Sequence, residues 1–154
     1  MELLAQMGDR LVEKGNGYFI SQRDEEIQIF LYNYCHYDLL YRYRHTVNMT
    51  QTNRYQVFSR RRREAFFIQM SHLAPGKYRI KRYGITRQGG SSYDAWVRMG
   101  APDTLNQEES AFLEAGSYPE YRTECEEVRE EEPVLNIRAS VKPLEVMLIK
   151  IRKE

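Results

Sequence analysis

The sequence predicts a mainly β protein, an antiparallel β-sandwich with an N-terminal helix and a two-helix insertion. Roughly eight short runs in which apolar and polar residues alternate make up most of the chain. Turn-forming residues separate these runs, and Ala74-Pro75-Gly76 is one example. With 154 residues, the chain can bury the core of one domain, and no second domain is needed.

Residues 1–15 are predicted to form a helix that ends at Gly15-Asn16-Gly17. Apolar side chains recur along one stripe of this segment at helical spacing: Leu3, Leu4, Met7, Leu11 and Val12. An apolar stripe needs a surface that covers it. We therefore expect the first four of these side chains to form an interface, either with the sandwich or with a second copy of the chain, and without such a partner the segment would fray.

The predicted sandwich occupies residues 16–154. The runs at 18–21 and 27–34 flank a polar turn at 22–25, which is typical of a β-hairpin. Residues 27–34 are apolar on both faces, and this indicates a central strand. Further strands are expected at 39–44, 54–58, 65–71, 77–85, 134–141 and 144–152, with a loop at 46–53.

Two features refine this set of strands. Pro75-Gly76 favours a tight turn, so the runs at 65–71 and 77–85 are expected to pair as a hairpin. The carboxylate-rich segment 120–132 is expected to be an exposed strand or loop, because neighbouring like charges resist burial. In the last strand, two alternating sets of side chains are expected on opposite faces, with Met147, Ile149 and Ile151 inward and Val146 and Leu148 on the reverse face.

A helical insertion is predicted at about 91–116. Ser91 or Ser92 can cap the first helix, and Gly100 followed by Pro102 can end it. A second helix is expected from the capping-box spacing of Thr104 and Gln107. We expect the first helix to lie on the strands with its aromatic residues in a core beneath it. Its structural motif is Tyr93, Trp96, Met99, Gly100 and Pro102.

Overall charge and cysteine content bear on the partners and the cellular location of the protein. The 23 Lys and Arg residues against 22 Asp and Glu residues give a net charge of +1, which attracts neither nucleic acid nor an anionic membrane. Cys35 and Cys125 lie far apart in the sequence, and no secretion signal precedes them. We therefore expect free thiols and a cytoplasmic location. No apolar run is long enough to span a membrane.

No pattern in the sequence predicts a reaction centre. Asp38 and Asp94 are isolated, and the six glutamates between residues 124 and 132 are expected to form a solvated acidic rim. His36 beside Cys35 lacks the spacing of a metal site. No serine lies in a nucleophile elbow. The sequence thus predicts no catalytic residue, no cofactor and no bound metal.

Two binding patterns leave alternatives open. Arg60-Arg61-Arg62-Arg63 could neutralise phosphates, but a charged hairpin tip is the simpler interpretation, so nucleic-acid binding through this segment is not expected. The 12 tyrosines could stack on sugar rings, although alternating aromatic residues in strands are more often cross-strand pairs. A carbohydrate-binding module is therefore the alternative function.

Three segments carry a family resemblance. They are residues 27–34, 75–80 and 92–102, and the most specific is the Tyr-x-x-Trp-x-x-Met-Gly-x-Pro pattern that begins at Tyr93. Together they resemble the C-terminal accessory β-sandwich of family 39 glycoside hydrolases, the β-xylosidase type. The resemblance is closest to the versions attached to AraC-type transcription regulators.

The resemblance implies a role without catalysis. In that family a (β/α)8 barrel carries two catalytic glutamates, and the accessory sandwich packs against the barrel. Residues 1–15 resemble the last helix of such a barrel, and no position of this sequence matches a catalytic glutamate. We therefore expect a noncatalytic domain that braces a catalytic or sensing barrel, with homodimerisation through the N-terminal helix as a further possibility.

Overall fold

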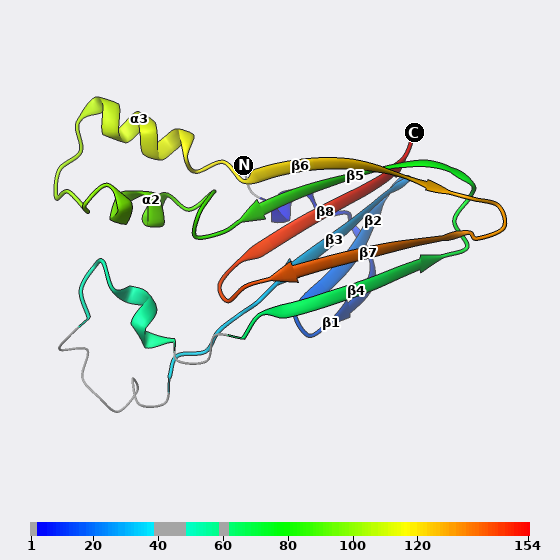
Figure 1. Cartoon of the computed structure of the whole chain (residues 1–154), viewed down its shortest axis with the longest axis horizontal. Helices are drawn as coiled ribbons and strands as arrows, with labels where there is room; N and C mark the ends of the chain where they lie inside the picture. Colours follow the sequence, from blue (N-terminus) through cyan, green and yellow to red (C-terminus); the bar gives the residue numbers. More distant parts are fainter. Residues whose placement is uncertain (1–2, 39–48, 59–61) are drawn as a thin grey trace.

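A computed structural model describes residues 3–38, 49–58 and 62–154. Eight strands within these ranges form two antiparallel sheets, in the orders β1-β2-β3-β8-β5-β6 and β4-β7 (Figure 1). An apolar core lies between the sheets, so the predicted antiparallel β-sandwich is confirmed. The strands are β1 (Arg10–Gly15), β2 (Tyr18–Arg23), β3 (Glu26–Tyr32), β4 (Glu64–Ser71), β5 (Gly76–Ile85), β6 (Glu120–Val128), β7 (Val134–Val141) and β8 (Val146–Lys153).

The predicted N-terminal helix is wrong. The segment forms one short 3-10 helix, η1 (Leu4–Gln6), and then strand β1, which pairs with β2. Gly8 lies so close to β2 that a Cβ atom there would be 2.3 Å from the Gln22 carbonyl oxygen. Asn16-Gly17 forms the turn of a hairpin, with a positive φ of 81° at Gly17, so the residues expected to end a helix instead connect two strands.

The second hairpin and the centre of the larger sheet are as predicted. β2 and β3 pair across a turn at Asp24-Glu25, and β3 pairs with β8 on its other side. Ile149 and Ile151 of β8 point into the core between the sheets, while Leu148 points to the opposite, outer face. Both faces of β3 and β8 carry apolar residues because each face packs against a different part of the chain.

The predicted hairpin of residues 65–71 and 77–85 is wrong, although both strands exist. β4 pairs with β7 in the smaller sheet, whereas β5 pairs with β6 and β8 in the larger one. The Pro75-Gly76 bend therefore carries the chain from one sheet to the other. Phe66, Ile68 and Met70 alternate along β4 and pack on the core, so β4 is held by the facing sheet rather than by β5.

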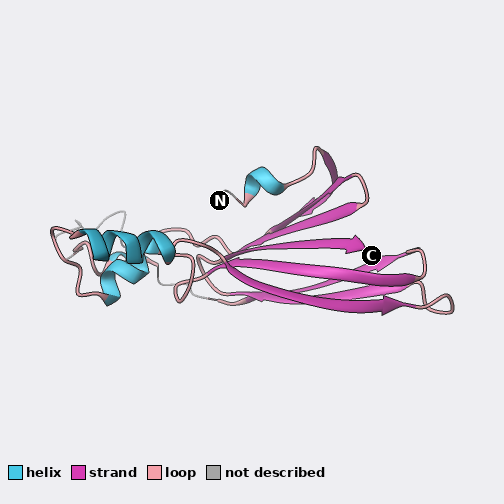
Figure 2. Cartoon of the chain, turned by 90° about the horizontal axis from the view of Figure 1, so that it is seen from above, coloured by secondary structure: helices cyan, strands magenta, loops and turns pink. Residues whose placement is uncertain are grey.

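The insertion contains two helices, α2 (Ser92–Arg98) and α3 (Gln107–Ala115), as predicted. Ser91 caps α2, but the capping box of α3 is formed by Asn106 and Glu109 rather than by Thr104 and Gln107. Figure 2 shows both helices beyond one end of the strands. The expected position of α2 on the strands is therefore wrong.

The segments expected at 39–44, 54–58 and 120–132 have different outcomes. A 3-10 helix, η2 (Arg54–Val57), takes the place of the strand expected at 54–58. β6 is an exposed edge strand, as the carboxylate-rich composition indicates. The strand expected at 39–44 lies outside the described residues. No described helix has the length and apolar character that crossing a membrane requires.

Candidate functional site: the α2 junction and the outer sheet face

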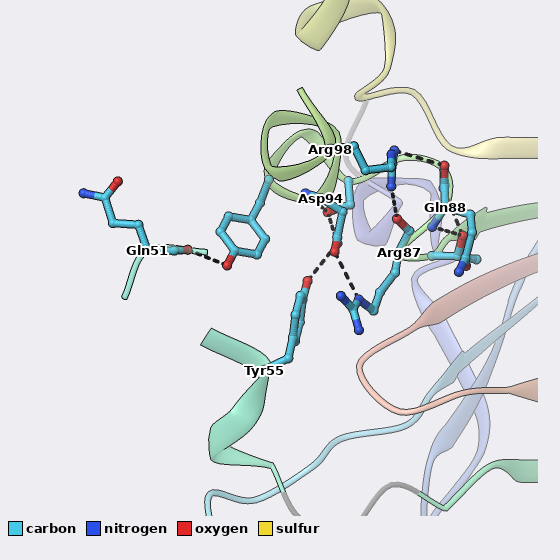
Figure 3. A network of polar contacts seen from close by, with 10 residues as sticks. Gln51, Tyr55, Arg87, Gln88, Asp94 and Arg98 are labelled. Atoms are coloured by element: carbon cyan, nitrogen blue, oxygen red, sulfur yellow. Dashed lines mark hydrogen bonds and ion pairs between the residues drawn. The ribbon is translucent and has the colours of Figure 1, made fainter. Parts of the chain in front are cut away.

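Asp94 is the centre of a polar network that we call the α2 junction (Figure 3). Its side chain accepts hydrogen bonds from the Tyr55 hydroxyl at 2.8 Å, the Ser91 hydroxyl at 2.7 Å and Arg87 Nε at 3.1 Å. Only 5% of Asp94 is exposed, so its charge depends on these donors for stabilisation. The four residues tie η2, the loop after β5 and the start of α2 into one unit.

Local sequence explains this arrangement. Ser91 is the N-cap of α2, and its hydroxyl accepts a hydrogen bond from the Asp94 backbone N–H at 3.2 Å. Asp94 thereby lies in the first helical turn, where the helix dipole favours a carboxylate. Arg87 stacks over the Tyr55 ring with 3.9 Å between its Cζ atom and the ring centroid. The junction is thus held by charge, hydrogen bonding and stacking together.

Further hydrogen bonds extend the junction along α2. Arg98 donates to the Arg87 carbonyl oxygen at 2.6 Å and to the Gln88 carbonyl oxygen at 3.4 Å (Figure 3). The Tyr93 hydroxyl donates to the Gln51 carbonyl oxygen at 2.6 Å. These contacts fix the helix to the end of the sandwich, which is a positioning role rather than a catalytic one.

Tyr55, the tyrosine of the α2 junction, is expected to lose its proton at a higher pH than an ordinary tyrosine. Burial, followed by the hydrogen bond to Asp94, raises the pKa of Tyr55 to about 12 from 10.0. The fold favours the neutral phenol, so this stabilisation is fully present below pH 10 and is lost as the pH rises through about 12. When absorbance is followed against pH, Tyr55→Phe should lack one phenol ionisation that the parent protein shows at high pH.

This titration needs a difference measurement, because burial also raises the pKa of Tyr78 and that of Tyr83. Tyr118→Phe is the control, since Tyr118 is 64% exposed and lies outside the junction. Identical late titration in the parent and in Tyr55→Phe would show that the phenol of Tyr55 is not buried in this network.

The residues of the predicted motif lie around α2 but not in either core cluster. Trp96 and Met99 are half-buried, and Trp96 Nε1 donates to the Pro102 carbonyl oxygen at 3.0 Å. Tyr93 lies 6.2 Å from Trp96 between ring centroids. Gly100 has a positive φ of 96°, which suits the end of a helix. The motif therefore shapes the insertion itself.

Sequence reasoning missed the centre of the junction. It treated Asp94 as isolated, whereas the structure surrounds this carboxylate with three donors. The three-residue spacing of Ser91 and Asp94 at the start of a helix was a usable signal for the first of these contacts. Nothing local indicates Tyr55, which is 39 residues away in the sequence.

The outer face of the larger sheet carries a second candidate site, which we call the apolar outer face. Fully or partly buried side chains from four strands and the N-terminal segment pack together there, on the side away from the sandwich core. Phe19 and Phe30 stack with ring centroids 4.9 Å apart, and Tyr83 lies 5.1 Å from Tyr121 of the edge strand. The members are Leu3, Met7, Phe19, Phe30, Tyr32, Tyr83, Ile85, Val146 and Leu148.

The four interface side chains predicted in the N-terminal segment differ in their burial. Leu3 is 5% exposed and packs in the apolar outer face, with Met7 partly buried against it. Leu4 and Leu11 are 59% and 57% exposed, and Leu11 lies on β1. The structure therefore separates the four side chains that the helical stripe had grouped together.

The acidic segment and the polar hollow beside it hold no arrangement typical of catalysis. Arg82 pairs with Glu124 at 2.8 Å, and its Nη1 donates to the Arg138 carbonyl oxygen. Both contacts lie in a hollow of about 670 Å³ whose described lining residues include no aromatic side chain on which a sugar could stack. Among the described residues, no group of three or more His, Cys, Asp or Glu side chains could hold a metal ion.

Comparison with known proteins identifies the fold. No protein-family profile matches the sequence, and the comparison with curated proteins found no match. Among solved structures, the GH39 enzyme from Xanthomonas axonopodis pv. citri matches 99% of this chain with a TM-score of 0.75 and 13% identity. The chain has the fold of one part of a GH39 enzyme.

Two further structures share this fold. A monomeric β-xylosidase from Caulobacter crescentus CB15 matches 98% of the chain with a TM-score of 0.70 and 19% identity. A bacterial orthologue of human α-L-iduronidase matches 99% of it with a TM-score of 0.65 and 15% identity. The chain spans 29% of the length of the first two proteins and 26% of the third.

Proposed function

We propose that this chain is the noncatalytic accessory β-sandwich of a larger GH39-like, β-xylosidase-like protein, in which it braces a (β/α)8 barrel. The observation that supports this most directly is the apolar outer face. It lies on the side of the larger sheet that the smaller sheet does not cover, and it combines aromatic and aliphatic side chains from β2, β3, β8 and β5. Its members are buried or partly buried, and the neighbouring Tyr121, which contacts Tyr83, is 52% exposed, so the margin of the face around these two rings is where another domain would make contact.

The path of the N-terminal segment supports the same arrangement. Leu3 packs in the apolar outer face beside Phe30 and Leu148, so the chain enters the fold on that side of the sheet. In this proposal, residues 1–15 lead from the barrel into the sandwich. The barrel would then lie next to the surface that it covers.

The absence of catalysis in the proposal is supported by the size of a barrel and by the contacts of two carboxylates. A (β/α)8 barrel takes about 250 residues, more than this chain has. The buried Asp94 is engaged by three donors, and Glu124 is paired with Arg82. The proposal therefore assigns hydrolysis, where the parent protein performs it, to the barrel.

The proposal includes an AraC-type regulator as a possible parent. There the sandwich would transmit the occupancy of a sensing barrel to a DNA-binding segment, and the α2 junction is the ordered unit at the end of the sheet that would carry such a signal. A cytoplasmic location belongs to the proposal as well, supported by the free thiols of Cys35 and Cys125.

The test is made in the longer protein that the open reading frame upstream of Met1 would encode. Tyr83→Lys and Ile85→Lys place a charge in the apolar outer face and should separate the unfolding of the barrel from that of the sandwich in calorimetry. Phe67→Lys is the matched control, because Phe67 is 60% exposed on β4. Unchanged joint unfolding in the outer-face variants, or an upstream frame that encodes no barrel, contradicts the proposal.

Two assays of the isolated chain separate the alternatives. The bracing role predicts no hydrolysis of aryl xylosides and no saturable heat or fluorescence change with xylo-oligosaccharides. Saturable binding at millimolar concentration or tighter would instead support a carbohydrate-binding module. A concentration-dependent dimer in sedimentation that Tyr83→Lys abolishes would instead favour a second copy on the apolar outer face.

A further inference from the structure

We infer that four cations on the outer sheet face form a docking site for carboxylates on the surface of a partner protein. The four residues, which we call the basic square, are Arg79 and Lys81 of β5 and Lys150 and Arg152 of β8. The inference builds on the proposed function, in which the partner is the barrel domain, and it adds the charge that this partner must present.

The register of the sheet defines the square. Arg79 lies directly opposite Arg152, and Lys81 lies directly opposite Lys150. Ile80, Ile149 and Ile151, which alternate with these residues along the two strands, point into the core, so all four cations lie on the outer face. Directly opposite side chains begin about 5 Å apart, and successive ones on the same face of a strand about 7 Å apart.

The nearby carboxylates of Glu26 and Glu154 offset only part of this charge. Like charges opposite each other destabilise an antiparallel pair, and the square contains two such pairs in adjacent positions. Glu154 pairs with Arg79, and Glu26, which lies opposite Arg152 in the register of β3 and β8, is 3.8 Å from Lys150. Within the described part of the chain, Lys81 and Arg152 make no ion pair. A hollow of about 420 Å³ is lined by the square together with Glu26, Lys153 and Glu154.

The square is continuous with the apolar outer face. Lys150 Nζ lies 5.8 Å from the centroid of the Tyr83 ring, and Leu148 is two positions before Lys150 on the same face of β8. A single partner can therefore bury apolar groups against the aromatic side chains and place carboxylates over the cations. Charge of this kind mainly sets the orientation and the specificity of docking.

The geometry favours a protein surface over a nucleic acid. The square has two cations on each of two strands and is compact. A phosphate backbone is normally bound by a longer row of positively charged residues. The neighbouring edge strand β6 carries Glu127 on the outer face, opposite Lys77 in the register, and the whole chain has a net charge of only +1. A cluster of two or three carboxylates matches the square in both size and charge.

A binding assay with the isolated chain tests the inference. The probe is a fluorescein-labelled twelve-residue peptide that contains four Glu and two Leu residues, and its partner peptide has Gln at each Glu position. We expect saturable binding of the Glu peptide and no binding of the Gln peptide. The charge-reversed variant Lys81→Glu/Arg152→Glu should bind the Glu peptide at least about tenfold more weakly, because it replaces attraction by repulsion.

The matched control is Arg10→Glu/Lys14→Glu on β1, which changes the net charge equally at the other edge of the sheet and should leave binding unchanged. Lys81→Gln/Arg152→Gln is a second variant in case the charge-reversed chain misfolds. It removes both charges without reversing them and should also weaken binding. Equal affinity in the parent and both variants of the square overturns the inference. Tighter binding of single-stranded oligothymidylate than of the Glu peptide also overturns it, in favour of a phosphate polymer.

The longer protein separates this inference from the bracing role. Joint unfolding of barrel and sandwich that is insensitive to Lys81→Glu/Arg152→Glu would overturn the inference and leave the bracing role in place. A second outcome is also informative: the barrel does not dock, but the protein binds the Glu peptide and the variant loses this binding. That outcome would contradict the bracing role and would support the square as a site for another acidic partner.

Discussion

Asp94→Ala is expected to loosen α2 from the end of the sandwich and to lower its local unfolding free energy by about 2–4 kcal/mol. The substitution removes the acceptor for Tyr55, Ser91 and Arg87 at once. Hydrogen bonds to a charged group contribute about 1.5–3 kcal/mol each, but they are not additive. Arg87 is 47% exposed and contributes least, since water screens its charge.

Hydrogen exchange of the α2 amides measures this loss, and Trp96 fluorescence reports the same helix. Asp94→Asn keeps the shape and one carbonyl acceptor, so its effect should be smaller than that of alanine. Asp103→Ala is an exposed control outside the network. If Asp94→Ala leaves the exchange of the Met99 amide unchanged, the carboxylate does not hold the helix, and the α2 junction has no positioning role.

The second large effect is expected in the core between the sheets. Ile149→Ala should lower the global free energy of unfolding by about 2–5 kcal/mol, because the removed atoms leave a cavity that close-packed neighbours do not fill. Ile149 is fully buried and lies in the central strand β8, opposite Ile29 of β3 and Arg82 of β5. Denaturant unfolding followed by circular dichroism gives the value.

Leu11→Ala is the informative partner of this variant. Leu11 lies on β1 and is 57% exposed, so the structure predicts a change within about 0.5 kcal/mol. A helical stripe packed on the sandwich would instead make Leu11→Ala cost several times more. Comparable losses for Ile149→Ala and Leu11→Ala would therefore contradict the position of β1 in the sheet.

The elements that were predicted correctly are those whose evidence lies within a short stretch of sequence. The β2–β3 hairpin follows from two alternating runs around a polar turn, and the two faces of β8 follow from alternation at residues 146–151. The start of α2 follows from Ser91 or Ser92 as a capping residue, and in the structure Ser91 is the cap. Local chemistry is sufficient in each of these cases.

The errors concern partners that are distant in the sequence. Pro75-Gly76 specifies a bend, but the sequence does not say whether the next strand pairs with the previous one or crosses to the facing sheet. Leu3, Met7 and Leu11 have helical spacing, but the Asn16-Gly17 turn and the close approach of Gly8 to β2 favour a strand. Tertiary contacts therefore override the local period.

The candidate sites show the same division. The motif around Trp96 was found because it is contiguous, but its position beyond the end of the strands depends on contacts with η2 that no local pattern shows. Asp94 gains two of its three donors from outside the helix. The basic square was missed for a related reason, since its four members come from strands about 70 residues apart that only the register of β5 and β8 brings together.

The exposed strand β6 has a consequence for how the protein behaves in concentrated solution. An unpaired strand edge can template the addition of another chain and so begin polymerisation. Each β6 edge carries Glu120, Glu124, Glu126 and Glu127, so two copies that approach edge to edge repel each other at neutral pH. The acidic side chains of β6 thus disfavour the edge-to-edge addition of further copies that would begin a fibre.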